Sequence, residues 1–143
     1  YRAIFVGTLK SAWMASPSLG VPRQTLAASK LVDYPLLMQS PTSTIAQLYD
    51  NWLKDNGVSP KRAFRTNSLP VLGQLTLAGL GISTLPCDYY QAEVSSHRLQ
   101  VVKTRPAAPS VDYYIVHRAE GAGRGIEEIA RLVRSSCNFR RST

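Results

Sequence analysis

Long apolar runs are missing from this sequence of 143 residues. No stretch approaches the roughly 18 apolar residues that a membrane-spanning helix needs, so the sequence predicts a soluble protein without a membrane segment. Low-complexity runs are missing too, and a hydrophobic share of 44% is ordinary, which argues against disorder. A chain of this length can fold as one domain, or as one domain and a piece of another, without a disulfide or a metal.

Cysteine and histidine are scarce, with two residues of each. Cys87 and Cys137 lie far apart, and His97 and His117 stand alone, whereas a structural zinc site needs about four ligands in close pairs. We therefore expect no metal site, and two small thiols in a reducing cytoplasm. No general acid–base pair and no G-x-S-x-G motif stands out, so catalysis would require Cys87 to meet a histidine in the folded chain.

Acidic residues are few, with nine Asp and Glu against 17 Lys and Arg, and the formal net charge is +8. Such a balance attracts anions, including nucleic acids and carboxylate ligands. The basic residues are spread singly from Arg2 onward, and the densest group consists of Arg131, Arg134, Arg140 and Arg141. Nucleic-acid-binding surfaces gather their charge on one element, so we favour a solvated basic surface over direct nucleic-acid binding.

Short apolar runs alternate with helical patterns, which predicts an α/β fold. Because strand–helix–strand units force parallel pairing, we expect a parallel sheet. The apolar run 35–38 lacks alternation and indicates a strand covered on both faces. Strands are expected at 3–6, 11–15, 35–38, 63–66, 82–86, 99–103 and 113–117.

Helices are expected between these strands, with recognisable caps. Ser40 or Ser43 can cap a helix that ends at Gly57, and Asn67 or Ser68 can cap the next one. Two short helices are expected at 25–32, capped by Thr25, and at 89–93, capped by Asp88. The last helix, at 125–136, is amphipathic and is expected to bury Ile126, Ile129, Ala130 and Val133.

The glycine pair Gly79 and Gly81 does not form a nucleotide-binding loop. The dinucleotide fingerprint has three glycines that leave a strand and open a helix. Here a helix ends and a strand begins, which is the reverse order. We therefore expect a tight turn and no cofactor.

Polar residues recur where a strand is followed by a helix. Ser43 lies after the strand 36–38, and Asn67 and Ser68 lie after the strand 63–66. In open parallel sheets the ligand crevice lies outside the carboxyl ends of the strands, where helix N-termini offer free N–H groups to an anion. These residues are candidates for binding a polar or anionic ligand. Plain helix capping explains each hydroxyl equally well, so both interpretations stay open.

Four motifs follow one another along the chain: W-M-A-S-P, L-V-D-Y-P-L-L, N-W-L-K-D-N-G and N-S-L-P-V-L-G-Q-L-T-L-A-G-L-G-I-S-T-L-P. The most specific piece is A-G-L-G-I-S-T-L-P, from Ala78 to Pro86. In this order the motifs resemble the effector-binding domain of LysR-type transcriptional regulators. The resemblance continues through 99–102 and 113–116 to the last helix, so it spans nearly the whole chain.

The resemblance implies an α/β fold like that of periplasmic binding proteins. Residues 10–106 would form a complete Rossmann-like second lobe, and 1–9 with 107–143 would be a remnant of the first lobe: its last strand before the crossing, its return strand and its closing helix. It also implies a cytoplasmic homo-oligomer, a dimer or tetramer, that binds a small effector between its lobes. DNA would be bound only through an N-terminal winged helix-turn-helix, which is absent from this sequence.

The resemblance places the second lobe's share of the effector site at Asn67 and Ser68. Thr8, on the crossing segment, is the next candidate, and Ser43 is a weaker one. Each is expected to hydrogen bond to a polar or anionic effector, with no catalytic residue. The leading hypothesis is thus an effector-sensing domain that is not an enzyme. The alternatives are an extracytoplasmic solute-binding protein and an enzyme that uses Cys87.

The incomplete first lobe has a consequence for assembly. It should expose a strand edge and the apolar face of the helix that contains residues 126–133. Such surfaces normally find a partner, so the chain is not expected to be a monomer by itself.

Overall fold

The computed structural model describes residues 1–119 and 123–138. Its strands form a five-stranded sheet in the order β5-β4-β6-β2-β7 and two pairs, β1-β9 and β3-β8. The strands are β1 (Arg2–Leu9), β2 (Ser11–Ala15), β3 (Leu26–Ala27), β4 (Leu36–Gln39), β5 (Ala63–Thr66), β6 (Ile82–Pro86), β7 (Gln100–Val102), β8 (Thr104–Arg105) and β9 (Val111–His117). We call the part from β2 to β8, residues 11–105, the five-stranded unit, and the β1-β9 pair the ribbon.

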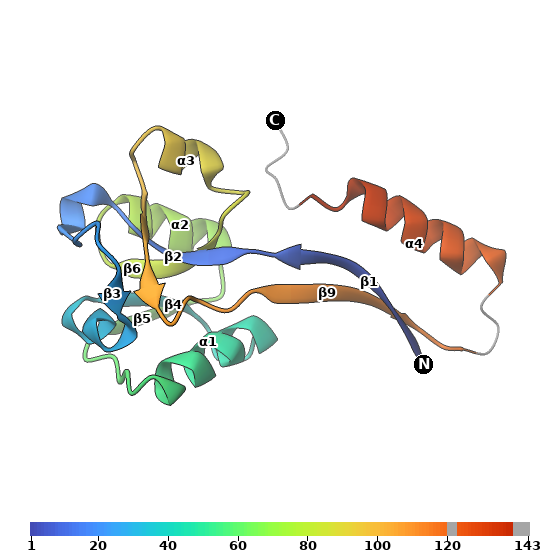
Figure 1. Cartoon of the computed structure of the whole chain (residues 1–143), viewed down its shortest axis with the longest axis horizontal. Helices are drawn as coiled ribbons and strands as arrows, with labels where there is room; N and C mark the ends of the chain where they lie inside the picture. The colour runs from blue at the N-terminus through green and yellow to red at the C-terminus, as the bar shows by residue number, and fades with distance from the viewer. Residues whose placement is uncertain (120–122, 139–143) are drawn as a thin grey trace.

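Four α-helices and two 3-10 helices accompany these strands. They are α1 (Thr44–Asp55), α2 (Leu69–Leu77), α3 (Gln91–Ser95), α4 (Arg124–Ser136), η1 (Pro17–Leu19) and η2 (Ala28–Asp33). Within the described ranges, none of the helices has the length and apolar character needed to cross a membrane. The ribbon projects from the five-stranded unit, and α4 lies beside it (Figure 1).

The sheet of the five-stranded unit is mixed, not parallel throughout. β4 is parallel to both β5 and β6, as the units β4-α1-β5 and β5-α2-β6 require. β2, by contrast, is antiparallel to β6 and to β7. The prediction of parallel pairing is therefore wrong for β2, because β2 continues directly from the ribbon and is not reached through a strand–helix–strand unit.

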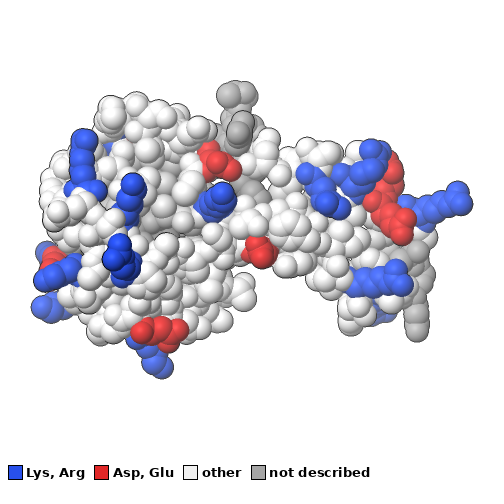
Figure 2. Space-filling view, viewed as in Figure 1, with Lys and Arg blue, Asp and Glu red and all other residues white. Residues whose placement is uncertain are grey.

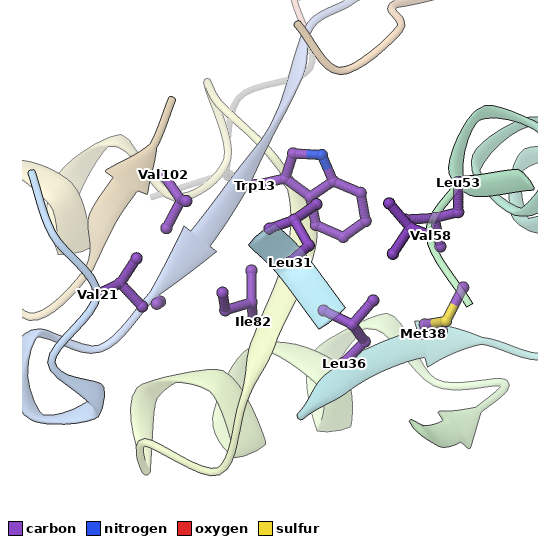
Figure 3. Close-up of a cluster of buried hydrophobic side chains, with 10 residues drawn as sticks. Trp13, Val21, Leu31, Leu36, Met38, Leu53, Val58, Ile82 and Val102 are labelled. Carbon is purple, nitrogen blue, oxygen red and sulfur yellow. The ribbon is translucent and has the colours of Figure 1, made fainter. Parts of the chain in front are cut away.

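Both faces of this sheet carry apolar clusters. On β4, Leu36 and Met38 belong to one cluster and Leu37 to the other, and all three are buried. This confirms the prediction from the non-alternating run, since successive side chains of a strand point to opposite faces. The first cluster centres on Trp13, with Leu36 and Ile82 below its ring (Figure 3).

The predicted caps of the two main helices are present. The Ser43 hydroxyl accepts from Ala46 N at 3.5 Å at the start of α1, and the Ser68 hydroxyl accepts from Val71 N at 3.3 Å at the start of α2. Gly57, just after α1, has a φ of +69°, a left-handed conformation that favours glycine.

Two of the short helices differ from the prediction. Leu26 N donates to the carbonyl of Lys103 at 2.9 Å, so 26–27 form the strand β3 and only a 3-10 helix follows, without a cap from Thr25. Asp88 does not cap α3 either, because α3 begins later, with Tyr90 at its N-cap. The turn before it places the Tyr90 ring in the core, where it is buried.

The last helix, α4, buries less than its pattern predicts. Ala130 is buried, but Ile126 is only half-buried, Ile129 is 57% exposed and Val133 is 38% exposed. Burial of all four side chains was therefore the wrong expectation. The reason is that α4 packs on a ribbon of only two strands, which offers a narrow surface.

Candidate functional site

The carboxyl ends of β4 and β5 lie side by side, and a helix follows each of them. Gln39 pairs with Thr66 in the parallel register, and Ser40 N donates to the Thr66 carbonyl at 3.0 Å. The N-termini of α1 and α2 therefore lie at one edge of the sheet, with their caps Ser43 and Ser68. Two positive dipole ends at one edge favour a negatively charged or polar ligand.

The polar residues at this edge combine capping with spare hydrogen-bonding capacity. Ser68 is half-buried, whereas Asn67 beside it is exposed, with its side chain accessible from solvent. The Ser43 hydroxyl lies 3.5 Å from Gln39 Oε1, a long hydrogen bond. The Ser68 hydroxyl uses one lone pair in capping and keeps its proton for another acceptor, whereas the Ser43 proton is already directed at Gln39. The capping interpretation is thus confirmed for both serines, and it leaves ligand binding possible at the same residues.

Thr8 lies on a different element from the other candidates. It is on β1 of the ribbon, opposite Asp112 on β9, and its hydroxyl donates to Asp112 Oδ1 at 2.6 Å. The proton of Thr8 is engaged by a carboxylate, so this hydroxyl offers only lone pairs to a ligand. The neighbouring negative charge also makes Thr8 a poor partner for an anion.

Trp13, which sequence reasoning treated only as a strand residue, has an unusual position near this edge. The ring is 1% exposed, and Nε1 has no hydrogen-bond partner among the described residues. A buried N–H without an acceptor costs about 1–3 kcal/mol. Trp13 also lines a small cavity of about 10 Å³, between the first turns of α1, the carboxyl end of β4 and the middle of β6. The cavity is lined by Trp13, Leu37, Met38, Gln39, Ala46, Tyr49 and Thr84.

Tyr49 connects α1 with the segment that returns to the ribbon. Its ring is buried, and its hydroxyl donates to the Pro109 carbonyl at 3.2 Å. Burial raises the pKa of Tyr49 above its ordinary value, while a hydrogen bond with the Ser11 side chain partly lowers it. The hydroxyl therefore keeps its proton at neutral pH. The apolar stripe of α1 predicted the ring's burial, but its hydroxyl partner lies 60 positions away in sequence.

Of three larger pockets in the described part of the chain, one of about 420 Å³ lies between α1 and the strands β4 and β5, with Met38 and Arg65 in its lining. The other two lie away from the carboxyl ends of β4 and β5. One, of about 490 Å³, lies along β2 and β7 and is lined at 11–13, 25, 101–105 and 107–108. The other, of about 330 Å³, is mainly apolar and lies beside Phe64 at the edge strand β5. No sequence motif pointed to either pocket.

Cys87 does not have the character of an activated nucleophile. It is half-buried at the end of β6, and its backbone N donates to the Lys10 carbonyl at 2.9 Å. Burial raises the pKa of Cys87, Asp88 raises it further, and Lys10 opposes them only in part. The group is thus a thiol at neutral pH, whereas reactive cysteines have lowered pKa values.

The charges form no continuous basic patch on the visible face of the five-stranded unit, where Lys and Arg lie singly (Figure 2). Over α4 they mix with acidic side chains, and Glu128 forms an ion pair with Arg131. Arg140 and Arg141, named with the basic group above, lie outside the described residues. In the ranges 1–119 and 123–138, no group of three or more His, Cys, Asp or Glu is placed to hold a metal ion.

Comparisons with known proteins agree with this architecture. A family model described as the LysR substrate binding domain matches residues 1–138. The HTH-type transcriptional regulator CbbR of Rhodospirillum rubrum is 30% identical over 105 residues, which are 73% of this chain and 35% of CbbR. The match therefore spans about a third of that relative's length.

Solved structures with the same fold belong to regulatory domains. The regulatory domain of HypT from Salmonella typhimurium has a TM-score of 0.71 at 21% identity, covering 94% of this chain and 66% of that one. The CcmR regulatory domain of Synechocystis in complex with 2-PG has a TM-score of 0.76 at 15% identity, covering 98% and 69%. At these identities the likeness concerns the fold.

Proposed function

This chain belongs to the LysR substrate-binding-domain family, and from that premise we propose that it senses an effector for a bacterial LysR-type transcriptional regulator. A small polar or anionic metabolite binds between two lobes and alters how the full-length protein binds DNA. The DNA contacts belong to an N-terminal domain outside this sequence. The effector acts by its different affinity for two arrangements of lobes or subunits, as any such switch requires.

Within this proposal, residues 10–106 form the second lobe, and 1–9 with 107–143 contribute to the first. The pairing of Leu9 with Val111 supports this division, because the chain leaves the ribbon and returns to it at adjacent positions. Within the range 107–143, residues 120–122 and 139–143 lie outside the described residues.

The observation that carries the proposal is the pair of helix N-termini at the ends of β4 and β5. Ser43 and Ser68 cap them at one edge of the sheet, and Asn67 is exposed beside Ser68. The net charge of +8 also favours an anionic ligand. The CcmR domain was solved with 2-PG, which supports a small-molecule effector for this chain as well. We propose Asn67 and Ser68 as principal contacts and Ser43 as a secondary one. Thr8, whose proton is engaged by Asp112, is a secondary contact only for a neutral or hydrogen-bond-donating part of the effector.

Asn67→Ala in the full-length regulator tests this site. Asn67 is exposed, so the fold should be unaffected, while losing a hydrogen bond to a charged ligand should weaken effector binding about tenfold. A native mass spectrum, compared with the denatured one, identifies the retained small molecule to be used as the probe. Asn51→Ala, at an exposed position on α1, is the control. Unchanged affinity and unchanged response in Asn67→Ala would show that the site is assigned wrongly.

We also propose that the protein works as a homo-oligomer. Large apolar side chains are exposed on both the ribbon and α4, among them Val116, Ile129 and Leu132. Exposed apolar surface of this kind marks an interaction site. Sedimentation of the purified chain should therefore show species larger than a monomer, and Leu132→Glu should shift them towards monomer. A monodisperse monomer before any substitution would contradict this proposal.

A further inference from the structure

The indole N–H of Trp13 is a buried donor close to the proposed effector site. The ring centroid of Trp13 lies 6.3 Å from that of Tyr49 and 5.7 Å from that of Trp52, both on α1. In Figure 3 the ring nitrogen lies on the side away from Leu36 and Ile82, which form the apolar floor. The donor therefore lies at the rim of the apolar cluster, and among the described residues nothing accepts from it.

The small cavity that Trp13 lines sets the size of the group that this donor can take. About 10 Å³ is roughly the space of one water molecule, so one oxygen atom of a larger ligand fits. Its polar lining comes from Gln39 at the end of β4 and Thr84 in the middle of β6, and Ala46 closes it from the first turn of α1. The start of a 12-residue helix adds a positive potential there.

We propose that this cavity is an oxygen subsite of the effector crevice, in which Trp13 Nε1–H donates to one carboxylate oxygen of the ligand. The remainder of the ligand lies at the strand ends, near Ser43 and Ser68. The proposal rests on the proposed function and narrows it, because it makes the effector a small organic acid. A donor-only N–H beside a helix N-terminus selects an acceptor that carries negative charge.

The indole N–H resonances of the ¹⁵N-labelled chain test this directly. The chain has two tryptophans, and Trp52→Phe assigns the signal of Trp13. Acetate and glycolate should shift the Trp13 indole resonance downfield in a saturable way, together with the backbone amides near Ser43 and Ser68. The Trp52 resonance should not move. Sodium chloride at equal ionic strength should leave the Trp13 signal in place.

Ala46→Val fills the cavity and should weaken carboxylate binding about tenfold, the loss expected for one charge-assisted hydrogen bond. Gln47→Val adds a valine side chain at the next, exposed position and should not weaken it. If Ala46→Val does not fold, the Trp13 resonance of the unchanged chain decides alone.

The possible outcomes separate this proposal from the proposed function. If carboxylates shift the amides near Ser43 and Ser68 but not the Trp13 indole, the subsite is overturned while the effector site stands. A Trp13 shift that chloride at equal ionic strength reproduces also overturns the subsite, because such a shift would not depend on an oxygen ligand. If neither the indole nor the amides respond to any carboxylate, both proposals fail for this lobe.

Discussion

The five-stranded unit and the ribbon with α4 differ in how they cover their apolar side chains. In the five-stranded unit, Leu72 on α2 and Ile82 on β6 are fully buried. On α4, Leu132 is 52% exposed, and on the ribbon Val116 is 62% exposed. Both regions have well-formed elements, so the difference is not one of secondary structure. The difference is whether another part of the same chain packs against these apolar side chains.

This comparison shows what an amphipathic pattern predicts and what it does not. α1 and α4 both carry an apolar stripe, but α1 lies against a five-stranded sheet and α4 lies against two strands. The stripe indicates that a surface is built to be covered. It does not indicate whether the cover comes from the same stretch of chain, which is why burial on α4 was overestimated.

Leucine truncations should show the largest difference in stability between the two regions. Leu72→Ala leaves a cavity in the core of the five-stranded unit and should lower the free energy of unfolding by about 2–5 kcal/mol. Leu132→Ala removes a half-exposed side chain from α4 and, at concentrations low enough to dissociate the proposed oligomer, should change it by less than about 0.5 kcal/mol. Urea unfolding of the two variants measures this. Equal losses would mean that α4 is covered in solution as fully as α2.

Substitution of glycine by alanine should change the free energy of unfolding in opposite directions in the two regions. A Cβ at Gly73 of α2 would overlap the hydroxyl of Tyr90, whose ring is buried, so Gly73→Ala should cost about 1–3 kcal/mol. A Cβ at Gly125 of α4 meets nothing within 4 Å, and Gly125→Ala should add up to about 1 kcal/mol of helix stability. Thermal unfolding followed by circular dichroism compares them. A stabilising Gly73→Ala would show that Tyr90 can move aside.

Alkaline pH should lower the free energy of unfolding of the five-stranded unit, by less than the substitutions above. The pKa of Tyr49 is raised above its ordinary 10.0 and that of Cys87 above its ordinary 9.0, each mainly by burial. The unfolded chain therefore loses these protons first. Their contribution to stability is complete below about pH 9 and is lost as pH rises through the folded-state pKa values.

Two substitutions isolate this effect. The free energy of unfolding, measured from pH 8 upward, should decline less steeply in the double variant Tyr49→Phe, Cys87→Ala. Tyr114→Phe, at an exposed position on the ribbon, should leave the slope unchanged. If all three curves run parallel, the two buried groups do not govern the alkaline limit.

The elements that sequence predicted best are those with local signals. Ser43 and Ser68 cap helices where the pattern placed them, and Gly57 follows α1 in the expected left-handed conformation. The failures depend on distant partners. Leu26 forms a strand because Lys103 accepts its hydrogen bond, and β2 is antiparallel because the chain comes from the ribbon.

The candidate site follows the same division. The edge formed by the ends of β4 and β5 was predictable, because each strand is followed by a capped helix. The Trp13 N–H and the Tyr49 hydroxyl were not, because their surroundings combine strand ends with residues as far away as Pro109. Thr8 was placed on the crossing segment, but its engagement with Asp112 depends on a strand more than 100 positions later.

Because Leu9 pairs with Val111, the five-stranded unit is joined to the ribbon at two adjacent positions, like a domain inserted into a loop. Because the chain leaves and rejoins the ribbon at adjacent residues, a short turn from Leu9 to Val111 would close the ribbon as a simple hairpin. The excised segment would have neighbouring ends, the arrangement in which circular permutation and transplantation into a host loop are tolerated. A fold built this way can exchange its five-stranded unit while the ribbon keeps its pairing.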